Sequence, residues 1–180
     1  MSERTEFRSL RLDPAVHDLG SFVSGESELD DWLSAHAVPA DRRGTARTWV
    51  WVDYEGSVVA YYSLVPHKVA RERVPGRIGR GGPVEIPAVL IAKLALSSSL
   101  QGRGLGKVLV VDALDRVLAA TAVVAARVVV VDALSDEVAG FYEHLGFSRI
   151  PGSRLLVQKV SDIAAALRDG DASQSASTER

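Results

Sequence analysis

The segment Gln101-Gly102-Arg103-Gly104-Leu105-Gly106 decides how the rest of this chain is interpreted. It lies between a nearly continuous apolar run at 88–96 and a stretch, 105–120, whose apolar residues recur at helical spacing. Glycines at such a junction leave room for a phosphate and permit unusual dihedrals, so that backbone N–H groups and the start of a helix can face one anion. We therefore predict a phosphate-binding loop between a buried strand and a helix.

Two other kinds of phosphate-binding loop match this segment poorly. A Walker A loop requires glycine where Gln101 stands and Ser or Thr where Val108 stands, so the pair Gly106-Lys107 does not indicate nucleotide hydrolysis. The dinucleotide-binding fingerprint requires glycines in the pattern G-x-G-x-x-G within a first βαβ unit. Here the glycines are spaced two apart, and a predicted hairpin and a long loop precede them.

The elements around this loop alternate between strands and helices, which predicts an α/β (α+β mixed) protein. Ser27 is expected to cap a helix that ends near Pro39. Ser135 is expected to cap another helix that runs to His144, with Gly146 as its C-terminal stop. Strands are predicted at 48–54, at 57–65 with Pro66 as its end, at 88–96, at 127–133 and at 154–160.

Length and composition predict one globular domain at 1–168, followed by a disordered tail at 169–180 in which alanine is the only apolar residue type. The absence of cysteine excludes disulfides, thiolate metal sites and a cysteine nucleophile, and no metal site is expected. The N-terminus is charged, and no stretch reaches the roughly 18 apolar residues of a membrane span. We therefore expect a cytoplasmic protein without a membrane segment.

The formal net charge of −2 conceals an uneven distribution. Residues 1–41 carry 3 basic and 9 acidic side chains, residues 42–107 carry 11 and 4, and residues 108–180 carry 7 and 10. The segment 71–87, predicted to be a loop from its four glycines and three prolines, holds four of the arginines. A cationic block of this kind indicates an anionic ligand or partner, or else a solvated basic face.

Two motifs together resemble those of the GNAT acyltransferases. The segment 101–106 has the pattern Gln-x-x-Gly-x-Gly that binds the pyrophosphate of coenzyme A in that family, and Phe141-Tyr142-Glu143-His144-Leu145-Gly146-Phe147 matches its Phe-Tyr-x-x-x-Gly-Phe segment. The order of elements between the motifs also agrees. The resemblance implies a GNAT fold, with a central mixed, splayed β-sheet flanked by helices on both faces, and an N-acetyltransferase that uses acetyl-CoA.

The same resemblance assigns roles to individual residues. Tyr142 would be the catalytic acid, which donates a proton to the CoA thiolate after an amine attacks the thioester directly. The cofactor-binding residues would be Leu94, Ala95, Leu96, Gln101, Gly102, Arg103, Gly104, Leu105, Gly106 and Lys107. A strong general base is not required, because an α-amino group has a pKa of about 7.7 to 8.0 and an ester lowers it further. His17, His36, His67 and His144 are interpreted as surface or packing residues.

Four further segments resemble the GNAT toxins of type II toxin–antitoxin systems, which acetylate the α-amino group of aminoacyl-tRNA and so stop translation. They are Leu29-Asp30-Asp31-Trp32-Leu33, Tyr61-Tyr62-Ser63-Leu64, Lys93-Leu94-Ala95-Leu96 and Val131-Asp132-Ala133. This resemblance implies aminoacyl-tRNA and a ribbon-helix-helix antitoxin as partners, and a homodimer. Lys93 replaces the arginine common at its position, and lysine lacks the bidentate fork of arginine.

In this interpretation the cationic block attracts the phosphates of a tRNA acceptor stem. The predicted tRNA-binding residues are Arg42, Arg43, Arg47, Lys68, Arg71, Arg73, Arg77, Arg80 and Lys93. One alternative is a GNAT enzyme that acts on a small amine or a protein N-terminus, for which acidic residues near the amine are usual. The other is a degenerate GNAT domain that serves as a binding module, against which the intact loop and Tyr142 count.

Overall fold

The computed structural model describes residues 7–178, and the side chains of its last helix as far as residue 170. The chain divides into two compact units, one formed by Met1–Pro66 with Ile91–Asp115 and the other by His67–Leu90 with Arg116–Arg180. Within the described residues, no helix is long and apolar enough to cross a membrane.

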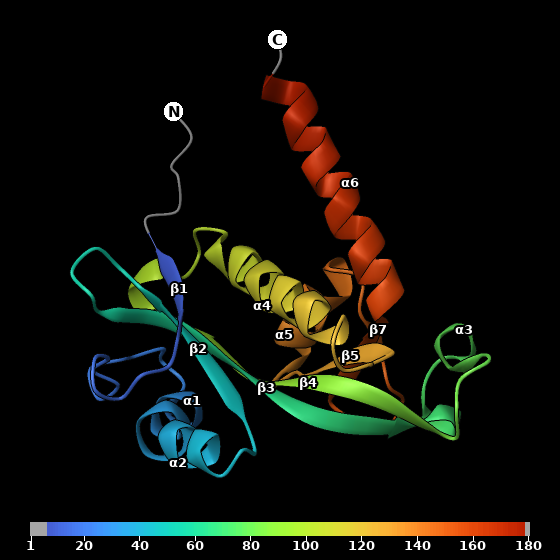
Figure 1. Cartoon of the computed structure of the whole chain (residues 1–180), viewed down its shortest axis with the longest axis horizontal. Coiled ribbons are helices and arrows are strands. Elements are labelled where there is room, and N and C mark those ends of the chain that lie inside the picture. Colours follow the sequence, from blue (N-terminus) through green and yellow to red (C-terminus); the bar gives the residue numbers. More distant parts are fainter. Residues whose placement is uncertain (1–6, 179–180) are drawn as a thin grey trace. The chain divides into compact units, whose positions relative to one another are not determined.

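The strands are β1 (Arg8–Arg11), β2 (Arg47–Val52), β3 (Val58–Ala70), β4 (Glu85–Leu96), β5 (Val128–Asp132), β6 (Ser148–Arg149) and β7 (Leu155–Lys159). They form one seven-stranded sheet in the order β1-β2-β3-β4-β5-β7-β6 (Figure 1). The pairs β1–β2, β2–β3, β5–β7 and β6–β7 are antiparallel. The mixed α/β class predicted from the sequence is confirmed.

The helices are α1 (Ser27–Asp31), α2 (Ala37–Arg42), α3 (Gly76–Gly79), α4 (Leu105–Thr121), α5 (Asp136–His144) and α6 (Val160–Thr178). A π-helical turn, η1 (Trp32–His36), joins α1 to α2, and η2 (Arg71–Arg73) and η3 (Ser98–Leu100) are 3-10 turns. The helix predicted at 105–120 is therefore confirmed within one residue.

The first helical segment continues beyond the predicted end at Pro39, as far as Arg42. In η1 the N–H of Ala37 donates to the carbonyl of Trp32, five residues back instead of four. A π turn of this kind shifts the hydrogen-bond ladder just before a proline that cannot donate, so the helix continues past it. The predicted cap is also wrong, because Glu26 is the N-cap residue and Ser27 is the first residue of α1.

Strand β3 also continues past a proline that was expected to end it. Pro66 lies inside β3, which ends at Ala70. Proline removes one donor from a ladder, but its φ is compatible with extended backbone, so a strand can tolerate it where that donor is not needed. Tyr61, which is fully buried in this strand, stacks on Trp32 at 6.0 Å and donates to the carbonyl of Leu29 at 2.7 Å. These contacts fix the first helical segment to the sheet.

The segment 71–87 is more regular than the predicted loop, because it contains η2, α3 and the start of β4. Val74 and Ile78 are buried in the same hydrophobic cluster as Ile86. The Arg71 side chain donates to the carbonyl of Gly82 at 2.8 Å. Burial of apolar side chains and the hydrogen bond from Arg71 therefore hold this glycine-rich segment in one conformation. The local sequence does not reveal this order.

The start of α5 matches the prediction, since the Ser135 hydroxyl accepts a hydrogen bond from the N–H of Val138 at 3.2 Å. Gly146 follows the helix with a φ of +97°, as expected of a C-terminal stop. Helix α6 continues to Thr178, into the stretch 169–180 for which composition predicts disorder. The division into one domain and a disordered tail stays a prediction, and residues 179–180 lie outside the described residues.

Candidate active site

The predicted phosphate-binding loop joins β4 to the N-terminus of α4. Gly102 and Gly104 have φ values of +74° and +77°, which favour glycine, and a Cβ added at either would meet no other atom within 4 Å. Space is therefore open around both residues. Leu105 begins a helix of 17 residues, whose N-terminus carries unpaired N–H groups and partial positive charge. This is the arrangement that a phosphate requires.

The side chain of Gln101 is occupied by the fold instead of being free for a cofactor. Its amide nitrogen donates to the carbonyls of Ser24 at 2.7 Å and Leu96 at 2.9 Å. Both donors of the amide are thereby used. Gln101 therefore anchors the glycine loop to the end of β4 and to the segment before α1.

A carboxylate near the middle of α4 fixes this helix to the sheet of the same unit. Asp112 Oδ2 accepts hydrogen bonds from Ser9 at 2.7 Å, Trp51 at 2.9 Å and Tyr62 at 3.0 Å. These donors come from β1, β2 and β3 in turn. A partly buried carboxylate with several donors is held firmly, and the orientation of α4 is fixed with it.

The strand residues assigned to the cofactor lead directly into the glycine loop. Leu94 is partly buried, whereas Ala95 and Leu96 are buried. Ser97, which follows them, donates its N–H to the carbonyl of Val59 at 2.8 Å. The structure thus brings 94–96 and 101–107 together in one unit, as one strand, loop and helix.

Tyr142 lies in the second unit, on α5, and 5% of it is exposed. Its ring contacts Phe141 and Phe147 with centroids 5.3 Å and 5.6 Å away. Its hydroxyl has no hydrogen-bond partner among the described residues. Burial, and then the negative charge of Asp132, raise the pKa of Tyr142 far above its ordinary value. The phenol is therefore a protonated donor at physiological pH.

Several residues predicted to bind tRNA are engaged within the protein. Lys93 forms an ion pair with Glu28 at 2.8 Å and has a side chain only 21% exposed, so it is poorly placed for a phosphate. Lys68 pairs with Glu85 at 2.6 Å. Arg47 donates to the carbonyl of Asp41, Arg71 to that of Gly82, and Arg77 to the hydroxyl of Ser148.

The other predicted tRNA-binding residues are exposed and have no side-chain partner within residues 7–170, the range whose side chains the structure describes. They are Arg42, Arg43, Arg73 and Arg80. The backbone of Arg80 is nevertheless fixed, because Arg127 donates to its carbonyl at 2.7 Å. Arg73 and Arg80 therefore project from an ordered segment of the second unit, and Arg42 and Arg43 from the end of α2 in the first.

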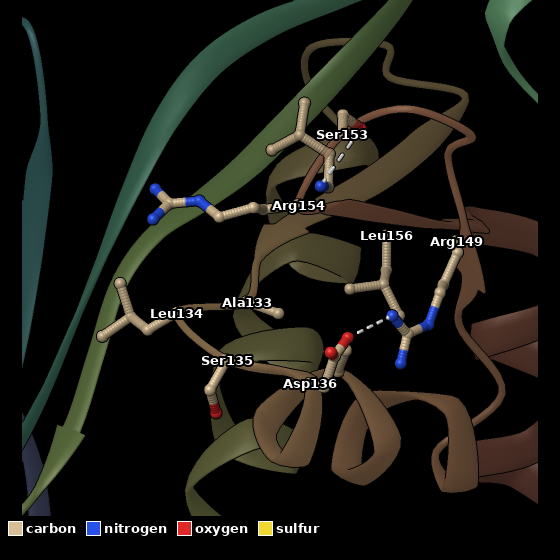
Figure 2. A pocket seen from close by; sticks show the side chains of 10 residues that line it. Ala133, Leu134, Ser135, Asp136, Arg149, Ser153, Arg154 and Leu156 are labelled. Carbon is tan, nitrogen blue, oxygen red and sulfur yellow. Dashed lines mark hydrogen bonds and ion pairs between the residues drawn. The ribbon is translucent and has the colours of Figure 1, made fainter.

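The second unit also contains a pocket of about 240 Å³ that the sequence did not predict. Figure 2 shows it between the start of α5, at Ser135 and Asp136, and the side chain of Arg149, which pairs with Asp136 at 2.8 Å. Its residues come from the connection between β5 and α5, from α5 and β6, and from the turn into β7 and the start of that strand, and tertiary pairing brings these segments together. In the part of the chain that the structure describes, no group of three or more His, Asp or Glu side chains could hold a metal ion.

The glycine loop of the first unit and the tyrosine of the second each belong to a motif that resembles those of coenzyme A-dependent acyltransferases. The chain belongs to the acetyltransferase (GNAT) family, whose model matches residues 9–147. It is thus an acetyl-CoA-dependent N-acetyltransferase with the GNAT fold, as the motifs at 101–106 and 141–147 imply.

Individual proteins and solved structures that are similar to this chain include toxins of this family. A tRNA-acetylating toxin of Mycobacterium tuberculosis (strain ATCC 25618 / H37Rv) is 37% identical over 150 residues, which are 83% of this chain and 90% of that protein. AtaT complexed with acetyl-methionyl-tRNAfMet is 28% identical, with a TM-score of 0.82 over 89% of this chain and 99% of that chain. A tyrosine-to-phenylalanine mutant of the AtaT toxin, bound to acetyl-CoA and the C-terminus of the antitoxin AtaR, is 26% identical, with a TM-score of 0.76 over 90% and 98% of the two chains.

Proposed function

We propose that this protein is the toxin of a type II toxin–antitoxin system that transfers acetyl from acetyl-CoA to the α-amino group of aminoacyl-tRNA. The observation that carries the proposal is the 37% identity to a tRNA-acetylating toxin over 83% of the chain. The open glycine loop and the buried Tyr142 lie within this family's motifs, so the chemistry that they serve is acetyl transfer. Blocking the α-amino group of a charged tRNA would stop translation.

In this proposal the pyrophosphate of coenzyme A lies against the N–H groups of the loop 101–106 and the start of α4. The positive φ of Gly102 and Gly104 turns successive N–H groups toward one side. Arg103 and Lys107 are both exposed and supply charge for the phosphates. The backbone of 94–96 would align the pantetheine arm and the thioester carbonyl.

The transfer itself would need no acyl-enzyme. The amine attacks the thioester carbonyl, the bond from carbon to sulfur breaks, and Tyr142 supplies a proton to the leaving sulfur. The absence of cysteine is consistent with such a direct route. Since its hydroxyl has no partner among residues 7–170, whose side chains the structure describes, Tyr142 can donate to a ligand without losing a bond to any of them.

The tRNA would be held mainly by side chains that the fold leaves exposed. Arg73 and Arg80 project from an ordered segment, so binding would cost little backbone entropy there. Arg77 is 59% exposed and can exchange its contacts with Ser148 and Asp162 for a phosphate. By contrast, Lys93 and Arg71 are held by contacts within the protein, so we propose that they stabilise the fold and do not bind tRNA.

The same proposal includes the protein partners of the toxin and the compartment in which it acts. A ribbon-helix-helix antitoxin would neutralise the toxin by covering basic surface with a flexible segment, because such a surface attracts an acidic or extended chain. A homodimer is part of this proposal. Since acetyl-CoA and charged tRNA are the substrates, the protein would act in the cytoplasm.

A cell-free translation reaction tests this proposal. Purified protein is expected to stop protein synthesis only when acetyl-CoA is present, and freshly charged tRNA added in excess should restore it for a time. Inhibition that does not depend on acetyl-CoA would contradict acetyl transfer as the cause.

A further inference from the structure

The segment that precedes α1 is joined by hydrogen bonds to the start of the predicted phosphate loop. The side-chain amide of Gln101 donates to the carbonyl of Ser24 at 2.7 Å. The N–H of Ser98 donates to the carbonyl of Val23 at 2.9 Å. Both bonds lie within the first unit, although β2, β3 and β4 separate the two segments in the sequence. The segment 23–24 therefore holds the chain where it enters the glycine loop.

Ser24 is in turn fixed by a carboxylate of α1. Ser24 is only 4% exposed, and its N–H and its hydroxyl both donate to Asp30 Oδ1, at 2.9 Å and 2.5 Å. The hydroxyl also accepts a hydrogen bond from the N–H of Glu26 at 3.2 Å. Hydrogen bonds to an ionised acceptor are stronger than those between neutral groups. Asp30 therefore determines the position of the Ser24 carbonyl.

These contacts form one continuous chain from α1 to the phosphate loop. Asp30 holds Ser24, and the Ser24 carbonyl accepts from Gln101, the first residue of 101–106. The amide nitrogen of Gln101 also donates to the carbonyl of Leu96 at 2.9 Å. Gln101 is thereby held between the end of β4 and the segment before α1.

The glycines that follow Gln101 cannot fix the loop by themselves. Gly102 and Gly104 have positive φ values and open space around them, and glycine has more conformational freedom than any other residue. A loop that becomes ordered only when its ligand binds loses affinity, because the entropy of ordering opposes binding. A preorganised phosphate site therefore needs an anchor directly before the glycines.

We propose that Asp30 is a positioning residue for acetyl-CoA, which holds the phosphate loop in its binding conformation through Ser24 and Gln101. This inference rests on the place proposed for the pyrophosphate, against the loop 101–106, and not on the acceptor of the acetyl group. Asp30 does not contact the cofactor, because a carboxylate would repel the phosphates. Helix α1, which lies outside the Gln-x-x-Gly-x-Gly motif, thus contributes to the affinity for coenzyme A.

Calorimetry of the full chain with acetyl-CoA tests this role. Asp30→Ala removes the acceptor of both Ser24 hydrogen bonds, so the Kd for acetyl-CoA should rise about 10-fold as the loop loses its preorganisation. Removal of a negative charge by itself favours an anionic ligand, so a weaker affinity can come only from the lost hydrogen bonds. A merely structural role would lower the melting temperature and the number of binding sites per chain, and would leave the Kd of the folded fraction unchanged.

Asp31→Ala is the matched control. Asp31 is the next residue of α1, is exposed, and has no side-chain partner within residues 7–170, whose side chains the structure describes. This variant makes the same change of charge on the same helix and should not raise the Kd. An equal rise in both variants would overturn the proposal, because it would not depend on the contacts with Ser24.

A double-mutant cycle tests whether Asp30 acts through Gln101. Gln101→Ala removes the link from the loop to Ser24, so the addition of Asp30→Ala should cause no further loss of affinity. Losses that multiply in the double variant would overturn the proposal. If Asp30→Ala does not fold, Asp30→Asn takes its place, with an expected rise of about 3-fold because an amide oxygen is a weaker acceptor than a carboxylate. A parental Kd in that variant would overturn the proposal as well.

Gly104→Val distinguishes this inference from the proposal on which it rests. Weaker binding in Gly104→Val together with a parental Kd in Asp30→Ala refutes the role of Asp30 alone. A parental Kd in both variants refutes the proposed place of the pyrophosphate as well. Binding of acetyl-CoA is measured without tRNA, so a parent that acetylates no charged tRNA refutes only the acceptor that we propose.

Discussion

At the scale of single residues, the role that we propose for Tyr142 can be tested by one substitution. Tyr142→Phe keeps the ring between Phe141 and Phe147 and removes only the hydroxyl, which has no partner among the described residues. We expect kcat to fall by about 10²–10⁴-fold while the affinity for acetyl-CoA, measured by calorimetry, is unchanged. Parental turnover in this variant would show that Tyr142 serves only in the packing of the hydrophobic core.

The raised pKa of Tyr142 leads to a prediction about pH. Because its folded-state value lies above the ordinary 10.0, the phenol keeps its proton as pH rises, and the acid form is not lost in the neutral to mildly alkaline range. The rate should rise with pH as the amine loses its proton, at a pKa of about 7 to 8, and then stay level to about pH 9.5. An alkaline fall below pH 10 that Tyr142→Phe abolishes would contradict this assignment.

Gly104 offers a test of the phosphate loop with a matched control. Gly104→Val would strain a residue at φ +77° by about 1–2 kcal/mol and place a side chain where the phosphate should lie. Affinity for acetyl-CoA should fall about 10²-fold, the loss of two charge-assisted hydrogen bonds. Gly44, at φ +72°, has equally open space around it, so Gly44→Val imposes similar strain and should leave the affinity at the parental value. Equal affinity in the two folded variants would refute the loop assignment.

The sequence could predict the positions of these residues but not all of their roles. The glycine pattern and Tyr142 were identified from motifs that are continuous in the chain. Gln101 was assigned to the cofactor, whereas its amide binds the carbonyl of Ser24, 77 residues away. Side-chain partners at such separations leave no local pattern.

At the scale of elements, the segment 71–84 is the ordered base from which Arg73 and Arg80 project. Replacing both residues with Gln should weaken tRNA binding and lower the slope of log affinity against log salt by about one for each phosphate that is no longer neutralised. Arg168→Gln, an exposed charge on α6, is the control that should leave the slope unchanged. A slope that stays at the parental value in the double variant would show that these arginines do not bind the phosphates.

The boundaries of the elements show where local sequence rules fail. Helices α4 and α5 begin where caps and periodicity predict, because their signals are local. Pro39 and Pro66 were both expected to end an element, yet the π turn η1 precedes one and β3 continues through the other. Ile78 is buried in a hydrophobic cluster, and that tertiary packing orders a segment that glycine and proline content predicts to be irregular.

At the scale of the whole molecule, the charge distribution follows the proposed function. The segment 42–107 carries 11 basic and 4 acidic side chains and contains both the predicted phosphate loop and all the arginines that were predicted to bind tRNA. The flanking segments are acidic, so the net charge of −2 gives no sign of a polyanionic substrate. The sequence predicted the family and the acetyl donor. Only the structure shows which of the basic side chains have partners within the protein and which are exposed without one.

The central claim is that the acetyl group is transferred to the α-amino group of aminoacyl-tRNA. The most direct measurement incubates the purified protein with acetyl-CoA and charged tRNA, releases the terminal aminoacyl-adenosine with a nuclease, and determines its mass. We predict a product heavier by one acetyl group, formed from charged but not from uncharged tRNA, and absent when Tyr142→Phe replaces the parent. An aminoacyl-adenosine of unchanged mass, from a protein that binds acetyl-CoA, would contradict the claim.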